Sequence, residues 1–145
     1  MNEILYLDTS ALVKLYVVEQ HSEYVQTLVN HADTLASSVI TFVETHAAFA
    51  AAERLGRISP SQHQQLKQKF KLDWPQLTQV EVTKDLLVRA AEFAQGFSLR
   101  AYDSLQLAAA DKIFRLTPNA LVFISFDQKL NQAAKLLGMQ VSELI

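Results

Sequence analysis

Four carboxylates lie at points where one predicted element of the chain ends and the next begins. They are Asp8, Glu44, Asp103 and Asp127. The first and the last follow short apolar runs, at residues 4–7 and 120–126, which are typical of strands buried on both faces. The other two lie near the predicted starts of helices. Because ligands gather outside the carboxyl ends of the strands in parallel α/β sheets, we expect the four side chains to face one site.

The chemistry that such a site predicts is metal-assisted hydrolysis of a phosphodiester. Four clustered carboxylates repel one another unless cations hold them together. Carboxylate oxygens in a chain without cysteine suit Mg²⁺ or Mn²⁺ rather than a thiolate-bound metal. Such ions also bind phosphate oxygens. One ion activates water, and a second ion, where present, stabilises the leaving oxygen.

Each acid also has a simpler structural interpretation. Asp8 and Asp127 precede predicted helices, and Asp is a preferred N-cap residue. Residues 41–44 read Thr-Phe-Val-Glu, the pattern of a capping box, in which the glutamate returns to the N-cap amide. Asp103 lies on a largely apolar helix stripe, where Arg100, three residues earlier, could pair with it. The residues alone leave both interpretations open for each acid.

The apolar pattern predicts short strands that alternate with helices. We expect strands at residues 4–7, 34–38, 77–82 and 120–126, with a last short strand from Val141. Helices are expected over residues 10–18, 22–31, 41–55 and 83–96, from Ser59-Pro60 up to Trp74, from a Ser98 cap onward, and in a segment that ends at Gly138. This alternation predicts an α/β protein with a parallel sheet covered on both faces. We expect residues 1–145 to form a single domain, because no Gly- or Ser-rich linker divides them.

Composition excludes several classes of function. The chain has no cysteine, which rules out disulfides and thiol chemistry. The formal net charge of −2 does not indicate a general nucleic-acid binder, so a polyanion would need a local cluster of cations or bound metal ions. The N-terminus lacks the pattern of a signal peptide, and no apolar run approaches the ~18 residues of a membrane span. We therefore expect a cytoplasmic protein without a membrane segment.

Three segments carry a resemblance to a known family. They are LDTSALVK at residues 7–14, LRAYDSLQLA at 99–108 and FISFDQKL at 123–130. In this order and context they resemble the acidic motifs of PIN-domain nucleases, particularly VapC-type toxins of type II toxin–antitoxin pairs. Glu44 falls where that family places its second acid. The resemblance covers nearly the whole chain, although no single motif is very specific.

The resemblance implies roles for individual residues. Asp8, Glu44 and Asp103 would form the metal-binding core, and Asp127 would complete the site. Ser10 matches the hydroxyl that supports the first acid, and Ser125 matches a small hydroxyl residue two positions before the last acid. The implied fold is a three-layer α/β/α sandwich around a short parallel sheet. The implied activity is that of a Mg²⁺- or Mn²⁺-dependent endoribonuclease. Such toxins usually form homodimers and are silenced by a cognate antitoxin protein.

The remaining polar residues admit two interpretations. Lys14, Arg100 and Lys129 lie within a turn or two of an acid, so each could contact phosphate or pair with that acid. The lysines at 67, 69 and 71 suggest a solvated helix face or part of an RNA-facing rim. The four histidines show no metal-ligand spacing, and we expect none of them to be catalytic.

Other functions remain open at this stage. A housekeeping PIN nuclease, or a catalytically silent PIN module that binds nucleic acid or protein, would carry the same motifs. A phosphatase or phosphotransferase with Asp8 as nucleophile usually needs an acid two residues later, where this chain has Ser10. A phospho-receiver needs a second acid beside the first strand and a lysine on a late strand, and neither is visible.

Overall fold

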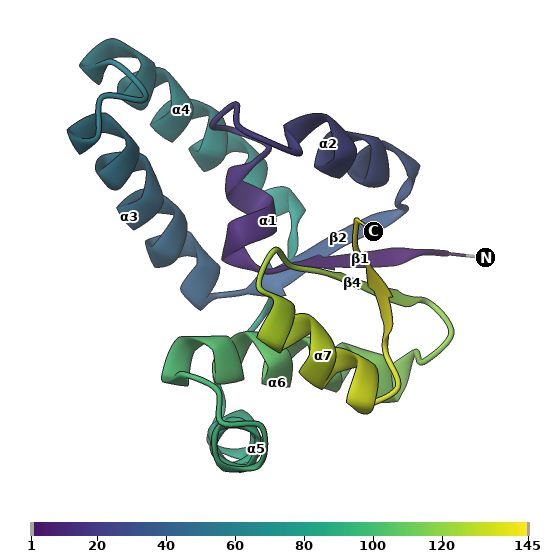
Figure 1. Cartoon of the computed structure of the whole chain (residues 1–145). Coiled ribbons are helices and arrows are strands. Elements are labelled where there is room, and N and C mark those ends of the chain that lie inside the picture. The colour runs from purple at the N-terminus through teal and green to yellow at the C-terminus, as the bar shows by residue number, and fades with distance from the viewer. Residues whose placement is uncertain (1, 145) are drawn as a thin grey trace.

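The computed structural model describes residues 2–144, and its centre is one parallel sheet of five strands (Figure 1). The strands are β1 (Ile4–Leu7), β2 (Thr34–Ser38), β3 (Thr78–Val80), β4 (Leu121–Ile124) and β5 (Gln140–Ser142). Their order across the sheet is β3-β2-β1-β4-β5, with every neighbouring pair parallel. The first strand thus lies at the centre, and all five carboxyl ends open toward the same side of the molecule.

Helices cover both faces of this sheet, as Figure 1 shows. One layer contains α1 (Thr9–Val13), α2 (Ser22–His31), α3 (Ile40–Arg54), α4 (Pro60–Asp73) and the 3₁₀ turn η1 (Trp74–Gln76). The opposite layer contains α5 (Lys84–Gly96), α6 (Ala101–Leu116) and α7 (Gln128–Leu136). The predicted three-layer α/β/α sandwich is therefore confirmed.

Alternation along the central strands builds a separate core on each face. Leu5 and Leu7 of β1 pack with the layer of α1 to α4, whereas Tyr6 packs with the layer of α5 to α7. Strand β4 alternates in the same way, and its Phe123 ring stacks on Tyr6 with centroids 5.7 Å apart. Burying each large apolar side chain stabilises the fold by roughly 1.5–3 kcal/mol. This two-faced burial explains why both strands read as continuous apolar runs.

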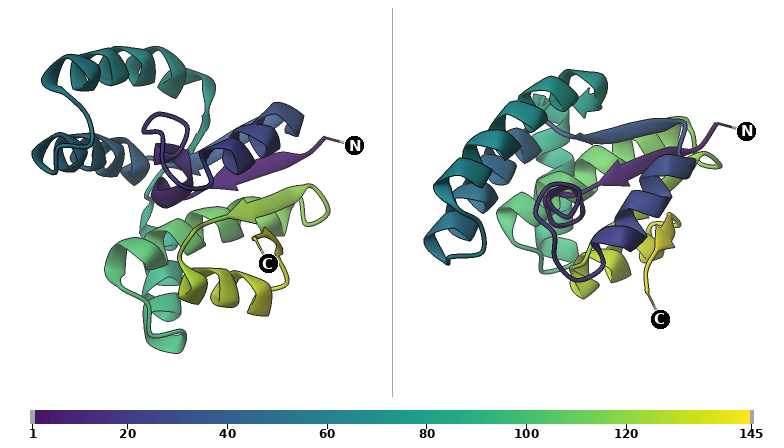
Figure 2. Two further views of the ribbon diagram at one scale, coloured as in Figure 1. Left: turned by 45° about the horizontal axis from the view of Figure 1, so that its top comes forward. Right: turned by 90° about the horizontal axis from the view of Figure 1, so that it is seen from above.

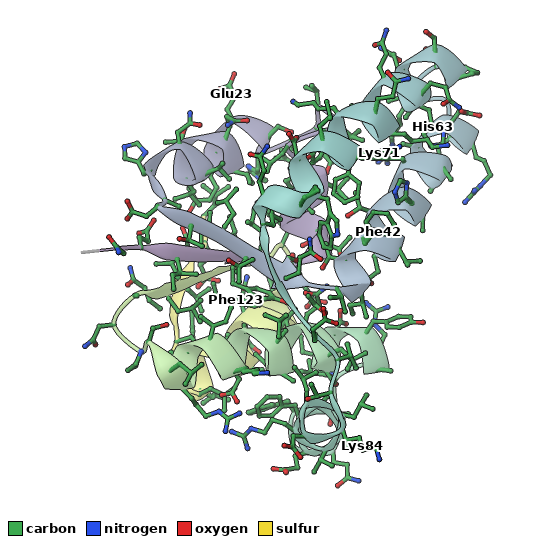
Figure 3. The ribbon with its side chains drawn as sticks, turned by 180° about the vertical axis from the view of Figure 1, so that it is seen from behind. Glu23, Phe42, His63, Lys71, Lys84 and Phe123 are labelled. Atoms are coloured by element: carbon green, nitrogen blue, oxygen red, sulfur yellow. The ribbon has the colours of Figure 1, made fainter. Side chains whose placement is uncertain are left out.

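The helices α3 and α4 lie side by side and extend past the carboxyl end of the sheet (Figure 2). Gly56, with a φ of +74°, allows the chain to leave α3. Ser59 then caps α4 ahead of Pro60, as predicted, and forms a capping box with Gln62. Aromatic rings hold the two helices together: Phe42 on α3, labelled in Figure 3, stacks on Phe70 of α4.

Several predicted boundaries are wrong at helix starts and ends. Helix α1 ends at Val13 rather than residue 18, because the chain then turns and buries Val17 in the core. The helix expected from Ser98 begins at Ala101, since Ser98 adopts a left-handed φ of 55° and Leu99 packs into the core. The capping box predicted at residues 41–44 does not form, because α3 already begins at Ile40.

The other predicted elements are close to those observed. The strand at 34–38 and the helix at 22–31 match in full, and Thr83 caps α5 as expected. Within residues 2–144, none of the helices is long and apolar enough to cross a membrane.

Candidate active site at the carboxyl end of the sheet

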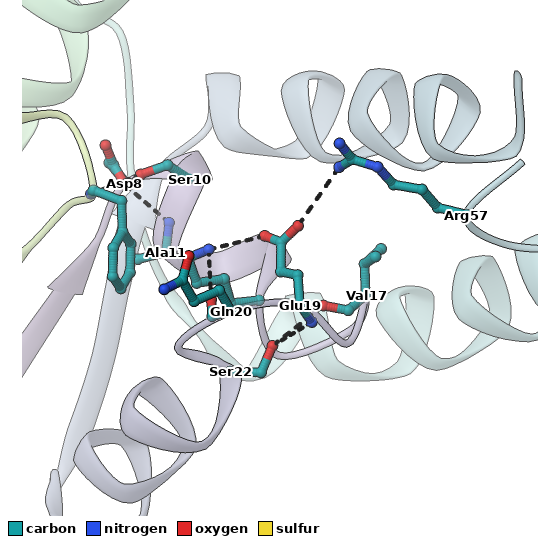
Figure 4. A network of polar contacts seen from close by, with 10 residues as sticks. Asp8, Ser10, Ala11, Val17, Glu19, Gln20, Ser22 and Arg57 are labelled. Atoms are coloured by element: carbon teal, nitrogen blue, oxygen red, sulfur yellow. Dashed lines mark hydrogen bonds and ion pairs between the residues drawn. The ribbon is translucent and has the colours of Figure 1, made fainter. Parts of the chain in front are cut away.

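Asp8 occupies the end of the central strand and begins helix α1. Its Oδ1 accepts hydrogen bonds from the Ala11 amide (3.0 Å) and the Ser10 hydroxyl (2.7 Å), as Figure 4 shows. Its Oδ2 accepts a bond of 2.5 Å from the hydroxyl of Ser125, which follows the neighbouring strand β4. The expected capping role is therefore confirmed, and both predicted hydroxyl residues contact this carboxylate.

Burial dominates the electrostatics of Asp8. The side chain is only 5% exposed, and desolvation raises the pKa of its carboxyl from 3.8 to about 6. The three hydrogen bonds oppose this rise, whereas the nearby charge of Asp103 adds to it. In the metal-free protein, the hydrogen bonds to Asp8 therefore do not fully compensate for the burial of its charge.

Glu44 lies in the second turn of α3, and two side chains hold one of its oxygens. Its Oε1 accepts hydrogen bonds from the Thr9 hydroxyl (2.7 Å) and from Nε2 of Gln106 (3.0 Å). Within residues 2–144, the hydrogen bonds to Glu44 all reach Oε1. The other oxygen of Glu44, Oε2, is therefore the one that can bind a metal ion or another ligand. Because Thr9 follows Asp8 in sequence, Glu44 is connected to the first acid.

Asp103 lies in the first turn of α6 and is partly exposed, at 25% of its side chain. Arg100 pairs with Asp103, with 3.3 Å between Nε and Oδ2. This is the ion pair that the structural interpretation of Asp103 predicted. The Arg100 side chain is 85% exposed, and such surface pairs contribute only about 0–1 kcal/mol. The pair can therefore open for a ligand at little cost.

Asp127 begins helix α7. Its Oδ1 accepts the amides of Lys129 (2.9 Å) and Leu130 (3.2 Å), which confirms the capping interpretation. Its own amide donates to the Ser125 hydroxyl oxygen at 3.0 Å. Ser125 thus connects the last acid to Asp8, although one oxygen of Asp127, Oδ1, already accepts both amides of its own helix.

The four acids meet at one end of the sheet without forming a closed cluster. Among residues 2–144, no group of three or more His, Cys, Asp or Glu side chains is placed to hold a metal ion. The donors nevertheless fit Mg²⁺ or Mn²⁺ in chemical type, because all are carboxylate oxygens. Mg²⁺ in particular usually takes one or two carboxylates and keeps several waters. Asp8, with its raised pKa, would gain from a cation beside it.

An apolar groove of about 700 Å³ leads away from these acids along α3. It is lined by Thr9, Ile40, Val43, Glu44, Ala47, Ala48, Ala51, Arg54 and Tyr102. The groove therefore begins at the polar residues of the site and ends at an exposed arginine.

The cations predicted to lie near the acids make different contacts. Lys14 pairs with Glu19 at 3.1 Å. Arg57 also pairs with Glu19, at 3.9 Å, as Figure 4 shows. The Lys14 ammonium also lies 4.5 Å from the ring centroid of Phe126. Lys129 donates to the carbonyl of Ser98 at 2.6 Å. Of the three candidates for phosphate contact, only Arg100 pairs with one of the four acids.

Sequence reasoning missed the buried polar residues beneath the acids. Gln106 contacts Tyr6 of β1, Thr9 of α1, and Thr41 and Glu44 of α3. Its one sequence signal is an amide within the apolar stretch of helix α6. That signal does not reveal the partners, because they lie 62 to 100 residues away.

A model of the PIN domain family matches residues 5–136, and the chain therefore belongs to this family. Two similar curated proteins are Ribonuclease VapC45 and Ribonuclease VapC49, from two strains of Mycobacterium tuberculosis. Each is 29% identical over 139 residues, which cover 96% of this chain and 94% of the relative.

Solved structures share the fold at low sequence identity. VapBC-1 from nontypeable Haemophilus influenzae gives a TM-score of 0.67 at 15% identity, over 97% of both chains. PAE2754 from Pyrobaculum aerophilum gives 0.66 at 22% identity, over 97% of this chain and 83% of that one. A toxin–antitoxin complex from Klebsiella pneumoniae gives 0.60 at 20% identity, over 86% and 88%.

Proposed function

We propose that this protein is a Mg²⁺- or Mn²⁺-dependent endoribonuclease and the toxin of a toxin–antitoxin pair. The observation that carries the proposal is the buried carboxylate of Asp8, held by Ser10 and Ser125 beside Glu44 and Asp103 in a PIN-family chain. The names of the two mycobacterial relatives support an RNA substrate.

The protein's own groups would prepare the site for hydrolysis. Ser10, Ser125 and the Ala11 amide fix both oxygens of Asp8, so this ligand is oriented before anything binds. Asp8, Glu44 and Asp103 would hold the ion, and Asp127 would act through Ser125. When bound, Mg²⁺ or Mn²⁺ would act as a Lewis acid on the phosphodiester and make water a better nucleophile.

Substrate contact would come from the exposed edge of the site. Arg100 is free to turn from Asp103 toward a phosphate, because its side chain is mostly exposed. Arg54 lies at the far end of the groove along α3. A few cations of this kind, together with a metal ion, would suffice to bind RNA despite a net charge of −2.

Two protein partners belong to the proposal. A cognate antitoxin would cover the apolar groove along α3, and the toxin–antitoxin complexes among the structural neighbours support this. A homodimer would bury exposed apolar side chains outside that groove, such as Leu87 and Val88. We propose that the protein acts in the cytoplasm, where its RNA substrate lies. Light scattering of the chain alone and with its antitoxin would measure both assemblies.

The test is RNA cleavage by purified, antitoxin-free protein in Mg²⁺ or Mn²⁺. We expect Asp8→Asn and Asp103→Asn to lower the cleavage rate by about 100-fold or more, since even outer-shell partners of metal sites contribute about 10- to 100-fold. Asp85→Asn, an exposed acid on α5, serves as the matched control and should cleave normally. Full activity of folded Asp8→Asn and Asp103→Asn would contradict the assignment.

A catalytically silent PIN module is the second candidate. The observation in its favour is that, within residues 2–144, no group of three or more His, Cys, Asp or Glu side chains is placed to hold a metal ion. Such a module would bind RNA or protein without turnover in any divalent metal. The cleavage assay distinguishes it from the nuclease, and a neighbouring antitoxin reading frame would distinguish a toxin from a housekeeping nuclease.

A further inference from the structure

We propose that Gln106 is a positioning residue that orients Glu44 for metal binding, an inference that rests on the proposed nuclease function. Gln106 lies on α6, one turn after Asp103, and is only 3% exposed. Its amide is placed between the central strand and helix α3. It therefore joins the elements that carry the first three acids.

The contacts of the amide nitrogen are directed at Glu44 and its neighbours. Nε2 lies 2.9 Å from the Thr41 hydroxyl oxygen, 3.0 Å from Glu44 Oε1 and 3.2 Å from the Thr9 hydroxyl oxygen. Nε2 has two hydrogens, and the two shorter contacts account for both. The Thr9 hydroxyl donates to the same oxygen of Glu44 at 2.7 Å. Glu44 Oε1 is thus held from two sides.

The Tyr6 hydroxyl fixes which way the amide faces. It donates to Gln106 Oε1 at 2.6 Å, and Tyr6 is fully buried in the sheet. A flipped amide would place its oxygen against the Glu44 carboxylate, two groups that only accept hydrogen bonds. The arrangement with Nε2 toward Glu44 is therefore the one that satisfies every group.

A chain of hydroxyls continues this network to the strand that carries Asp8. The hydroxyl oxygens of Thr41 and Ser37 lie 2.7 Å apart, and Ser37 donates to the Leu7 carbonyl at 2.6 Å. Because Ser37 has one hydroxyl hydrogen, Thr41 donates to Ser37 and accepts from Gln106. The network thus runs from Glu44 to the residue before Asp8.

This arrangement does more than fill the core. A buried amide must be satisfied, but it could be satisfied by backbone groups alone. Here one of its two N–H groups donates to an oxygen of an ionisable side chain, Glu44 Oε1, which leaves Glu44 Oε2 for a ligand. Partners of this kind that orient a metal ligand usually contribute about 10- to 100-fold to metal affinity.

The test compares Mn²⁺ binding and RNA cleavage of the full chain in three variants. Gln106→Met keeps the volume and removes the donor, and Tyr6→Phe keeps the donor but frees the amide. The double variant Tyr6→Phe/Gln106→Met removes both polar groups, so no hydroxyl is stranded and folding is retained. Mn²⁺ affinity is measured by electron paramagnetic resonance on protein without RNA.

We expect Gln106→Met and the double variant to weaken Mn²⁺ binding by about 10- to 100-fold and to lower kcat with little change in KM. Tyr6→Phe should give a smaller loss in the same direction. Asp111→Asn, a buried polar change five residues further along α6, is the control that loses stability without losing Mn²⁺ affinity.

Two outcomes separate this inference from the proposed function. Wild-type protein that neither binds Mn²⁺ nor cleaves RNA overturns both. Wild-type protein that binds Mn²⁺ and cleaves RNA, alongside a folded double variant with the same affinity and kcat, overturns the role of Gln106 alone.

Discussion

The carboxylate of Asp8 is held by three donors, yet its pKa is raised to about 6. Burial outweighs the hydrogen bonds, because Asp8 lies at the end of the central strand between two helical layers. The rise from 3.8 corresponds to about 3 kcal/mol of unfavourable free energy for the charged form. The buried carboxylate therefore lowers the stability of the metal-free protein, while its hydrogen bonds keep it oriented as a metal ligand.

Asp8→Asn is therefore expected to change the pH dependence of stability. Well below pH 4 the carboxyl is protonated in both states, so burial costs little. Between about pH 4 and pH 6 the unfolded carboxyl is ionised while the folded one keeps its proton, so the free energy of unfolding falls as the pH rises and levels off above the folded pKa. The asparagine variant does not ionise and should avoid this loss, which amounts to about 3 kcal/mol at pH 8.

Urea unfolding in EDTA at pH values from 4 to 8 measures this difference. The stability of Asp8→Asn relative to wild type should increase between about pH 4 and pH 6 and then level off above the folded pKa of Asp8. Asp85→Asn, on the exposed side of α5, controls for the loss of one charge. A relative stability that stays constant with pH would show that burial does not raise the pKa of Asp8.

Single residues differ in how far the sequence reveals them. Asp8 and Asp127 could be predicted because each directly follows a recognisable strand. Gln106 and Tyr6 could not, since their contact joins residues 100 positions apart. A glutamine in an apolar helix segment indicates a buried amide, but only the packed structure shows which acid that amide serves.

At the scale of elements, helix α3 shows why the role of Glu44 was ambiguous. A capping box at residues 41–44 was a sound local prediction, yet the helix begins at Ile40, and the Thr41 hydroxyl accepts from Gln106 instead. The tertiary contact between Gln106 and Thr41 thus replaces the local capping box, and the Glu44 carboxylate is available to the site. Where no such contact competes, as at Ser59, the local prediction is confirmed.

The packing of α5 on α6 depends on a buried acid outside the site. Asp111 is 2% exposed and pairs with Arg89 at 3.2 Å and Arg115 at 3.0 Å. Arg89→Met should lower the free energy of unfolding by about 1–3 kcal/mol, because it removes a charged hydrogen bond from a buried carboxylate. Arg115→Met, whose side chain is more exposed, should cost less. Denaturant melts measure both, and equal losses would contradict the dominance of Arg89.

At the scale of the molecule, the two central strands determined how well the fold could be predicted. The apolar runs that became β1 and β4 identified a parallel sheet buried on both faces. The order β3-β2-β1-β4-β5 and its register are products of packing that no local pattern contains. The same sheet brings Asp8 and Ser125 together, because β1 and β4 are neighbours.

Divalent metal should stabilise the whole molecule. The proposed site is formed by residues from four distant segments, so only the folded chain presents it, and binding adds to the free energy of unfolding. At 100 times the dissociation constant this gain is about 2.7 kcal/mol, or roughly 5–10 °C in Tm for a chain of this length. Thermal melts in Mg²⁺ or Mn²⁺ against NaCl of matched ionic strength separate binding from charge screening.

The variants show whether the gain comes from these acids. Asp8→Asn and Asp103→Asn should lose most of the metal-induced rise in Tm, whereas Asp85→Asn should keep it. Asp8→Asn should also begin from a higher Tm at pH 8 without metal, because it lacks the buried charge that the ion neutralises. Asp8→Asn should thus combine a higher Tm without metal with a smaller rise in Tm on adding metal. A variant that was merely misfolded would not show a higher Tm without metal. An equal rise in Tm for wild type and both variants would place the metal elsewhere.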